Sequence, residues 1–367
     1  MSKGIGRMDE QADGAMGVST MSRRTFLGRG AQIATALSVA AVAPDLFSGV
    51  ATASRRPGTA RLTPIEVQLN YELNIQFAGD MVALAEGYYA KKGFDVTLVP
   101  GGPNIAPEPV VASGKAFVGI THTTEAAQAI LNGAELKIIG AGYQKNPFCM
   151  ISSAKTPLKT PQSLYGKKVG ISASNSTTWN AFCAGAKLDV SKINVVSTSF
   201  DITSLADGEL DALMGFYTNE PILLAAQGFK PYVWLFADFG YPLMEEVYIA
   251  RRSTIASPSG RAELARFMSA EARGWAHQVA RPSLGALLAT KRYGKSLHLE
   301  LAEQVKAAQA QNRLVVSPDT AKHGLFWMTP KLIAETVRSA REGKVAASAA
   351  MFTNEILAAA YAKGRIS

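Results

Sequence analysis

The stretch LDALMGFYTNEP, Leu210–Pro221, decides the predicted fold, because a short apolar run within it ends abruptly in polar residues. The run Ala212–Phe216 is long enough for a buried strand and too short for a helix. Thr218 or Asn219 can then cap a helix over Glu220–Gln227, since either side-chain oxygen can accept from a free N–H of the first turn. The stretch therefore predicts a strand that runs directly into a helix, which is the basic unit of an α/β sheet.

The end of that predicted strand is also a candidate binding site. Open α/β sheets bind small molecules beyond the carboxyl ends of their strands, where helix N-termini present N–H groups. Tyr217, Asn219 and Glu220 stand at this point. The alternative is plain helix capping, because Thr353–Glu355 repeats the tripeptide Thr-Asn-Glu ahead of the helical run Ile356–Lys363. The upstream strand and the aromatic residue at the turn favour a ligand role for the first copy.

Composition places the chain among globular proteins with more than one lobe. It has 367 residues, of which 47% are hydrophobic and 18% are charged, enough to bury a full core and to form two lobes. The net charge of +9 is not gathered in a dense basic block, so we expect no nucleic-acid partner. Scattered Lys and Arg side chains can instead help contact with an anionic membrane surface or partner.

The N-terminus carries an export signal. Ser22–Leu27, SRRTFL, matches the twin-arginine pattern, and the apolar run Ala31–Ala43 is too short to cross the roughly 30 Å bilayer core. Ala51–Ala53 is the preferred cleavage site, with Ala41–Ala43 as the second choice. We therefore predict a signal peptide over 1–53, export by the twin-arginine translocase, and a periplasmic or extracellular protein. An ordinary amphipathic N-terminal helix is the alternative.

The chain after residue 62 alternates short apolar runs with helical patterns, which predicts βα units and mainly parallel sheets. The predicted strands cover 65–70, 94–99, 116–120, 137–141, 148–152, 168–172, 194–197, 212–216, 232–236 and 247–250. A connector rich in Pro and Lys, 154–161, predicts the crossing into a second lobe. We therefore assign 62–152 and 247–367 to the first lobe, with the helices after 257 supporting it, and 153–246 to the second.

Candidate ligand-binding residues follow the predicted strands. Each belongs to a strand-exit loop or to the start of the next helix, and each has a capping or core role as its alternative. They are Asn74, Phe77, Thr121, His122, Thr123, Tyr143, Ser174, Asn175, Ser176, Thr177, Tyr217, Asn219, Glu220, Asp238 and Tyr241.

Catalytic and metal sites are not indicated. The four histidines, at positions 122, 277, 298 and 323, are scattered without metal-ligand spacing, and no Gly-x-Ser-x-Gly elbow is present. We therefore predict a protein that is not an enzyme and that has no cofactor and no metal. Cys149 and Cys183 are the only thiols, and the sequence leaves open whether they form a disulfide.

Several motifs carry a family resemblance over nearly the whole chain after the signal. Asn74 and Gly79 precede ALAEGYY at Ala83–Tyr89, and GFDV at Gly93–Val96 and GKKVG at Gly166–Gly170 follow. This succession resembles ABC-transporter substrate-binding proteins of the group that binds alkanesulfonates, nitrate and thiamine pyrimidine precursors. The same group includes the fungal thiamine pyrimidine synthases.

The resemblance implies a type II periplasmic binding protein fold, with two α/β lobes joined by two crossovers that close on a small molecule. It also implies a monomer that delivers its ligand to an ABC permease in the inner membrane. YTNEP, Tyr217–Pro221, resembles the second-lobe ligand motif of the pyrimidine-binding branch. The synthases carry a cysteine-rich run used with iron, and Cys149 and Cys183, 34 positions apart (183 − 149), depart from that pattern.

The charges of the predicted exit loops narrow the chemical class of the expected ligand. The acids in these loops, set against Lys145 alone, are Glu72, Glu125, Asp201, Glu220 and Asp238. Aromatic residues lie among them, so a flat, amino-bearing heteroaromatic suits the loops better than a nitrate or sulfonate. The leading hypothesis is an importer's binding protein for a thiamine pyrimidine precursor or a similar nitrogen heterocycle. The alternatives are a synthase-like enzyme, a sulfonate or nitrate binder, and a sensory or scaffold subunit.

Overall fold

The computed structural model describes residues 61–102, 105–172, 175–198, 202–362 and 364. The predicted signal peptide over 1–53 and the predicted site residue Ser174 lie outside these ranges. Residues Met1–Arg56 and Pro57–Ser367 form separate units, and the fold below is that of the second unit.

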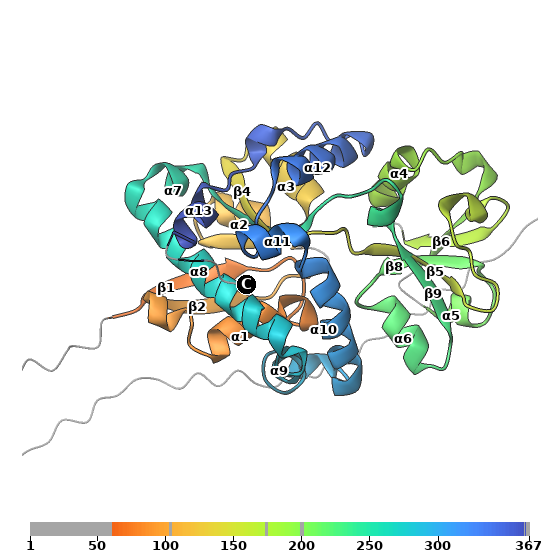
Figure 1. Cartoon of the computed structure of the whole chain (residues 1–367), viewed down its shortest axis with the longest axis horizontal. Coiled ribbons are helices and arrows are strands. Elements are labelled where there is room, and N and C mark those ends of the chain that lie inside the picture. The colour runs from red at the N-terminus through yellow and green to blue at the C-terminus, as the bar shows by residue number, and fades with distance from the viewer. Residues whose placement is uncertain (1–60, 103–104, 173–174, 199–201, 363, 365–367) are drawn as a thin grey trace, which may run out of the picture. The chain divides into compact units, whose positions relative to one another are not determined.

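Two five-stranded sheets organise this unit, and each defines one lobe (Figure 1). The first-lobe sheet has the order β2 (Phe94–Val99), β1 (Thr63–Gln68), β3 (Val118–Thr121), β10 (Glu245–Arg251), β4 (Leu136–Tyr143). The second-lobe sheet has the order β7 (Asn194–Thr198), β6 (Lys168–Ser172), β8 (Ala212–Phe216), β5 (Phe148–Ser153), β9 (Pro231–Leu235). The predicted α/β class with mainly parallel sheets is confirmed.

One strand in each sheet runs against the other four. β10 is antiparallel to β3 and β4, and β5 is antiparallel to β8 and β9. Both are the strands by which the chain enters a lobe from the other one. Because a crossing chain leaves one sheet at a carboxyl end and enters the next from the facing side, its strand must run in the opposite direction. The starts of β5 and β10 therefore share an edge with the carboxyl ends of their neighbours.

The first crossing differs from the prediction. We expected strand 148–152 in the first lobe and the crossing at 154–161, but β5 pairs with β8 and β9 of the second sheet. The crossing therefore lies between the end of β4 and the start of β5, over 144–147. The segment 154–161 connects two elements inside the second lobe. The sequence of an apolar strand does not by itself indicate which sheet the strand will join. The predicted boundary between lobe segments 62–152 and 153–246 is therefore wrong, and it lies at the crossing 144–147.

Helices cover both sheets. The α-helices are α1 (Ala78–Ala85), α2 (Pro107–Ala112), α3 (Thr123–Leu131), α4 (Ser176–Gly185), α5 (Thr203–Ala206), α6 (Glu220–Ala226), α7 (Arg252–Ala256), α8 (Pro258–Ala280), α9 (Pro282–Leu288), α10 (Leu301–Val315), α11 (Pro318–His323), α12 (Pro330–Glu342) and α13 (Glu355–Ala360). Short helical turns are η1 (Ile75–Phe77), η2 (Ala90–Lys92), η3 (Pro161–Leu164), η5 (Val190–Lys192), η6 (Phe236–Phe239), η7 (Ala289–Tyr293), η8 (Lys295–Leu297) and η9 (Ala349–Met351).

The first-lobe core lies between its sheet and the helix pair α1 and α8, which pack against each other. Two fully buried acids meet in this core, Asp80 of α1 and Glu271 of α8. Tyr89 and Tyr248 donate hydrogen bonds to Glu271. Neither Asp80 oxygen has a hydrogen-bond partner among the described residues. Burial and the charge of Glu271 raise the pKa of Asp80 well above its usual value.

The second-lobe strands alternate between two apolar layers, as the period of two requires. Met150 of β5 and Met214 of β8 join the layer under α4, whereas Ile151 and Leu213 join the layer under α5 and α6. Cys149 and Cys183 are both buried and both free, so no disulfide links them.

Helices after residue 257 do more than support the first lobe, because two of them also reach the second. α10 packs against α6, and α12 packs against α4 (Figure 1). Among the residues that the structure describes, no helix combines the length and the apolar character needed to cross a lipid bilayer.

Candidate ligand-binding site

The candidate site lies at the carboxyl edges of the two sheets. Both crossings start from these edges, since one follows β4 and the other follows β9. The strand exits of the first lobe therefore face those of the second, and polar side chains placed at the exits can meet between the lobes. This is the arrangement in which α/β proteins hold small molecules.

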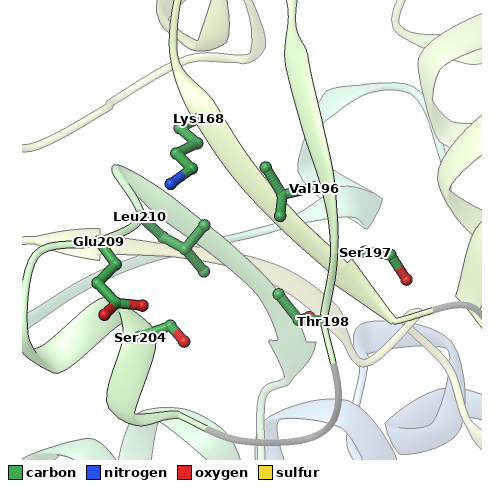
Figure 2. A pocket seen from close by; sticks show the side chains of 7 residues that line it. All are labelled: Lys168, Val196, Ser197, Thr198, Ser204, Glu209 and Leu210. Carbon is green, nitrogen blue, oxygen red and sulfur yellow. The ribbon is translucent and has the colours of Figure 1, made fainter.

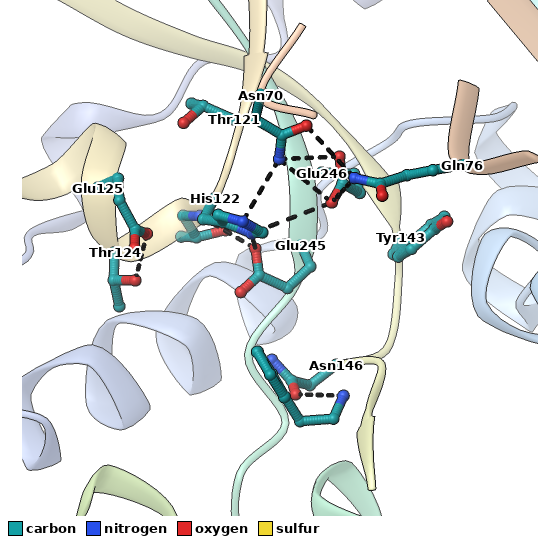
Figure 3. A network of polar contacts seen from close by, with 12 residues as sticks. Asn70, Gln76, Thr121, His122, Thr124, Glu125, Tyr143, Asn146, Glu245 and Glu246 are labelled. Carbon is teal, nitrogen blue, oxygen red and sulfur yellow. Dashed lines mark hydrogen bonds and ion pairs between the residues drawn. The ribbon is translucent and has the colours of Figure 1, made fainter. Parts of the chain in front are cut away.

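A polar network occupies the first-lobe edge (Figure 3). Gln76 Nε2 donates to Glu246 Oε1 at 2.8 Å and to Asn70 Oδ1 at 3.3 Å. Asn70 Nδ2 lies 3.4 Å from Glu246 Oε2. Asn70 follows β1, Gln76 lies in η1, and Glu246 lies at the start of β10, so one buried carboxylate ties the returning strand to the exit of β1. Sequence reasoning missed all three residues.

Glu245 makes the equivalent connection to the exit of β3. Its Oε2 accepts from the backbone N–H of Thr123 at 3.1 Å, and it lies 3.5 Å from His122 Nδ1. The carboxylate therefore occupies the N-terminus of α3, where a negative charge is stabilised by the helix dipole. The N–H groups that we predicted to face a ligand at this helix are partly used by Glu245.

The pKa of His122 is set by two opposing effects. Burial alone would lower it, but the hydrogen bond to Glu245 and the charges of Glu245, Glu125 and Glu246 raise it to about 10. His122 is therefore cationic at neutral pH.

The pKa of Glu246 is displaced in the same direction. Burial raises it, and His122 and the hydrogen bonds from Gln76 and Asn70 oppose the effect, with a net pKa of about 7. Glu246 also has a left-handed backbone, with φ of 52°, which costs a residue other than glycine roughly 1 to 3 kcal/mol. A buried acid and local backbone strain at the edge of a sheet are typical of functional sites.

The second-lobe edge is built around Glu220, the first residue of α6. Glu220 Oε2 accepts from the backbone N–H of Phe216 at 2.6 Å, and Oε1 accepts from Asn219 Nδ2 at 3.2 Å. Only 7% of Glu220 is exposed, and this burial raises its pKa. The carboxylate thus supports its own turn. The predicted cap is wrong, because Asn219 is the N-cap residue but makes no side-chain capping hydrogen bond. Glu220 also lies at the strand exit that the ligand interpretation requires.

The pKa of Tyr71 in the first lobe is affected by Glu220 in the second. Tyr71 follows β1 in the first lobe and is 44% exposed. Burial raises the pKa of Tyr71, and the charges of Glu72 and then of Glu220 raise it further. The charge of a second-lobe carboxylate therefore contributes to the raised pKa of a first-lobe phenol.

Several predicted rings lie elsewhere. Phe77, Tyr143 and Tyr241 are buried in the hydrophobic cores, with 1% exposure or less. Tyr143 accepts a hydrogen bond from Gln311 Nε2 at 2.8 Å, so its hydroxyl is also occupied. Burial leaves these three rings little surface to offer a ligand, although Tyr143 ends β4 opposite Glu245 at the first-lobe edge (Figure 3). Tyr71 and Tyr217 are the more accessible aromatic residues at the exits of β1 and β8.

The remaining first-lobe candidates have structural partners. Thr121 donates to Glu108, Thr123 donates to the carbonyl of Met244, and both are buried. Asn74 caps η1 by accepting from the N–H of Gln76. Of the predicted first-lobe residues, His122 is the one that combines a charge with a partly exposed side chain.

The second-lobe candidates gather at two helix starts. Asn175, Ser176 and Thr177 open α4, where Ser176 and Thr177 are exposed. Tyr217 and Asn219 precede α6, and the hydroxyl of Tyr217 accepts from Arg313 Nη1 of the first lobe at 3.1 Å. Asp238 lines the same cavity as Tyr217 and forms an exposed ion pair with Lys145 at 3.7 Å.

One cavity lies between the two lobes, and another lies within the second lobe. One of about 230 Å³ has Lys145 and Arg313 on its first-lobe side and Tyr217 and Asp238 on its second-lobe side. The other, of about 240 Å³, is lined by second-lobe residues alone, among them Lys168, Thr198 and Glu209 (Figure 2). Because the second cavity involves a single lobe, the closing of two lobes cannot enclose a ligand there.

The missed residues had a weak signal in the sequence. Glu245 and Glu246 stand directly before the apolar strand Val247–Ala250, and adjacent acids usually mark a solvated loop. Glu246 finds its partners in Asn70 and Gln76, which are about 170 positions away in the chain, and Glu245 finds its partners in His122 and Thr123. Two acids at the start of a strand that returns to an earlier sheet are the signal that could have found them.

A comparison with protein-family models decides the family. The model described as NMT1/THI5 like matches residues 74–284, which is more than half of the chain and includes parts of both lobes. The chain belongs to the NMT1/THI5-like family. The family resemblance predicted from the sequence is thereby confirmed.

Two curated relatives illustrate the family's range. The chain is 25% identical over 302 residues to the riboflavin-binding protein RibY of Chloroflexus aurantiacus, covering 80% of this chain and 85% of that protein. It is also 25% identical over 228 residues to the formylaminopyrimidine-binding protein of Halalkalibacterium halodurans, covering 60% and 68%. Both relatives are named as binding proteins, in agreement with the predicted solute-binding class.

Solved structures share the fold. The periplasmic aliphatic sulphonate binding protein SsuA from Escherichia coli aligns with a TM-score of 0.57 at 15% identity, covering 76% of this chain and 85% of SsuA. The desulfurization enzyme DSZB aligns with a TM-score of 0.52 at 14% identity, covering 82% and 99%. The predicted periplasmic binding protein fold is confirmed, and the fold alone does not separate binding from catalysis.

Proposed function

We propose that this protein is the exported solute-binding component of an ABC importer and that it captures a small nitrogen heterocycle between its two lobes. The observation that carries the proposal is that the strand exits of the two lobes face each other, with a direct contact between the lobes where Arg313 Nη1 of α10 donates to the hydroxyl of Tyr217 after β8 at 3.1 Å. A flat ring held there can stack on the accessible aromatic residues of the two exits, and each stacked pair contributes about 0.5 to 1.5 kcal/mol beyond area burial.

The ligand class follows from the groups that the edges present. Glu220 can accept from an N–H of the ligand through the lone pairs that Phe216 and Asn219 leave free. The named ligands of the two relatives, riboflavin and formylaminopyrimidine, are nitrogen heterocycles. A thiamine pyrimidine precursor or a similar heterocycle therefore remains the proposed ligand, with Tyr71, Asn70, Gln76, His122, Asn175, Ser176, Tyr217, Asn219 and Glu220 as the proposed contacts.

The mechanism is hinge closure about the two crossings. An open form admits the ligand, closure excludes water, and the closed form docks on a permease in the inner membrane. Affinities of micromolar to nanomolar, about −8 to −12 kcal/mol, are sufficient for scavenging. The motif SRRTFL at Ser22–Leu27 supports export by the twin-arginine translocase to the periplasm or cell exterior, and we propose that the protein acts as a monomer.

Calorimetry on the purified protein tests this function. The titrants are pyrimidines, flavins, alkanesulfonates and nitrate at matched pH and ionic strength. We expect one or more heterocycles to bind with micromolar or tighter affinity and the anions to bind at least tenfold more weakly. Binding of the anions alone would contradict the heterocycle proposal, because the acids of the two edges would then have the wrong charge for the ligand.

A synthase-like enzyme is the competing function, since the fold also occurs in DSZB. Elemental analysis and absorption spectroscopy of the purified protein discriminate the two. The binding-protein proposal predicts neither iron nor pyridoxal phosphate at stoichiometric amounts, and mass spectrometry of copurifying small molecules would identify the ligand directly.

A further inference from the structure

His122 brings a positive charge to the first-lobe edge (Figure 3). Its Nδ1 lies 3.5 Å from Glu245 Oε2 and 4.0 Å from Glu246 Oε1, and these carboxylates are only 3% and 4% exposed. An opposite charge within about 4 to 6 Å favours the protonated imidazole. The His122 side chain keeps 35% of its surface exposed, so a ligand can reach it.

The protonated ring offers hydrogen-bond donors and no acceptor. Nδ1–H faces Glu245, which leaves Nε2–H for another partner. The nitrogen Nδ2 of Asn70 lies 3.5 Å from Nε2, but an amide nitrogen is itself a donor and cannot accept. Nε2–H therefore calls for an acceptor, and a ligand oxygen can supply it.

The second lobe requires a hydrogen-bond donor from the ligand, whereas His122 requires an acceptor. Glu220 is an acceptor, so a ligand between the edges must present an acceptor to His122 and an N–H to Glu220. A neutral heterocycle that carries both a ring carbonyl and a ring N–H supplies both groups. A 4-aminopyrimidine has only ring nitrogens as acceptors. It is also a stronger base than its oxo counterpart and takes up a proton more readily. The protonated, cationic pyrimidine would be repelled by the positive charge of His122.

We infer that His122 is a specificity-determining residue that selects nitrogen heterocycles bearing a ring carbonyl over their amino counterparts, with Glu245 and Glu246 as positioning residues that hold it. This inference rests on the proposed function and deepens it, because within the nitrogen heterocycles it favours a ligand with an oxo edge, such as a pyrimidinone or a flavin ring. It thereby disfavours those thiamine pyrimidine precursors that keep a 4-amino group.

A matched ligand pair tests the inference. The probes are 2-methyl-5-hydroxymethylpyrimidines that carry either an oxo or an amino group at carbon 4, titrated into the purified protein at pH 7. We expect the oxo compound to bind at least about tenfold more tightly, as is usual when a charged hydrogen bond is gained. His122→Gln should weaken the oxo compound by about tenfold or more and change the amino compound by less than threefold. His298→Gln, an exposed histidine, should change neither.

A second variant tests the inference independently in case His122→Gln does not fold. Glu245→Gln keeps the shape of the side chain but removes the charge that favours protonated His122. With the oxo compound as titrant, the alkaline pH at which affinity is half lost should move down by a unit or more, whereas the ligand's own ionisation is common to both proteins. The groups that face His122 are Glu245, Glu246, Glu125 and Asn70.

The outcomes separate the two proposals. If the amino compound binds as tightly as the oxo compound, or if His122→Gln leaves their ratio unchanged, the inference is wrong and the proposed function stands. An unchanged alkaline midpoint in Glu245→Gln also contradicts the inference. If no heterocycle binds to the unmodified protein, both the inference and the proposed function fail.

Discussion

Glu220 shows how one residue can serve both a turn and a ligand. Its two oxygens accept from Phe216 N–H and from Asn219, so the carboxylate closes the loop between β8 and α6. A carboxylate has about four lone-pair sites, and two remain for a ligand N–H. The turn therefore orients the acid before any ligand arrives, which reduces the ordering cost of binding.

Glu220→Gln separates the two roles. The amide oxygen can still accept from Phe216 N–H, so we expect the unfolding free energy in urea to change by less than about 1 kcal/mol. Loss of the charged acceptor should weaken heterocycle binding by about tenfold or more. Glu355→Gln is the matched control, because Glu355 follows the same Thr-Asn pair at the start of α13 and is exposed. A large loss of stability with unchanged binding would support capping alone.

Asp80 leads to a prediction on stability and pH. Its pKa is raised in the folded state, so the folded protein holds a proton that the unfolded chain releases above about pH 4. The contribution of Asp80 to stability is therefore greatest at acid pH and falls by roughly 1.4 kcal/mol per pH unit as pH rises toward the folded-state pKa. Asp80→Asn cannot ionise, so its stability relative to the unmodified protein should increase from pH 5 to pH 8.

Urea unfolding across that pH range measures the effect. Asp95→Asn is the control, since Asp95 is exposed on β2 and should leave the pH dependence unchanged. A constant stability difference between Asp80→Asn and the unmodified protein at every pH would show that Asp80 is ionised in the folded state.

At the scale of elements, the strands were well predicted because burial and β-propensity are local. Phe94–Val99, Lys168–Ser172 and Ala212–Phe216 have the predicted bounds. The sheet that a strand joins is not local, and β5 was therefore assigned to the wrong lobe. The same distinction explains why only part of the site was predicted. The strand-exit loops follow from the local sequence pattern, but the hydrogen bond between Glu246 and Gln76 joins residues far apart in the sequence.

The α1–α8 pair gives a prediction at this scale. A Cβ on Gly79 would lie 2.2 Å from the ring of Trp275, so the two helices approach closely only because Gly79 has no side chain. Gly79→Ala should lower the unfolding free energy by about 1 to 3 kcal/mol, because this overlap exceeds the helix-propensity gain of about 1 kcal/mol. Gly102→Ala is the control, since a Cβ there meets nothing within 4 Å. Equal stability of the two variants would contradict the close approach.

At the scale of the whole unit, the two crossings explain why the site lies where it does. Each antiparallel strand, β5 and β10, begins at the edge from which the other strands of its sheet emerge. Glu245 and Glu246 fasten the start of β10 to the exits of β3 and β1, so movement of this crossing is linked to the side chains proposed to bind the ligand. Closure and recognition would then use the same residues.

Hydrogen–deuterium exchange of the purified protein, with and without the tightest-binding heterocycle, tests the central claim most directly. Binding between the lobes predicts simultaneous protection of 69–77 and 121–124 in the first lobe and of 215–222 in the second. Protection confined to one lobe, or found only around the second-lobe cavity lined by Lys168 and Glu209, would contradict the account.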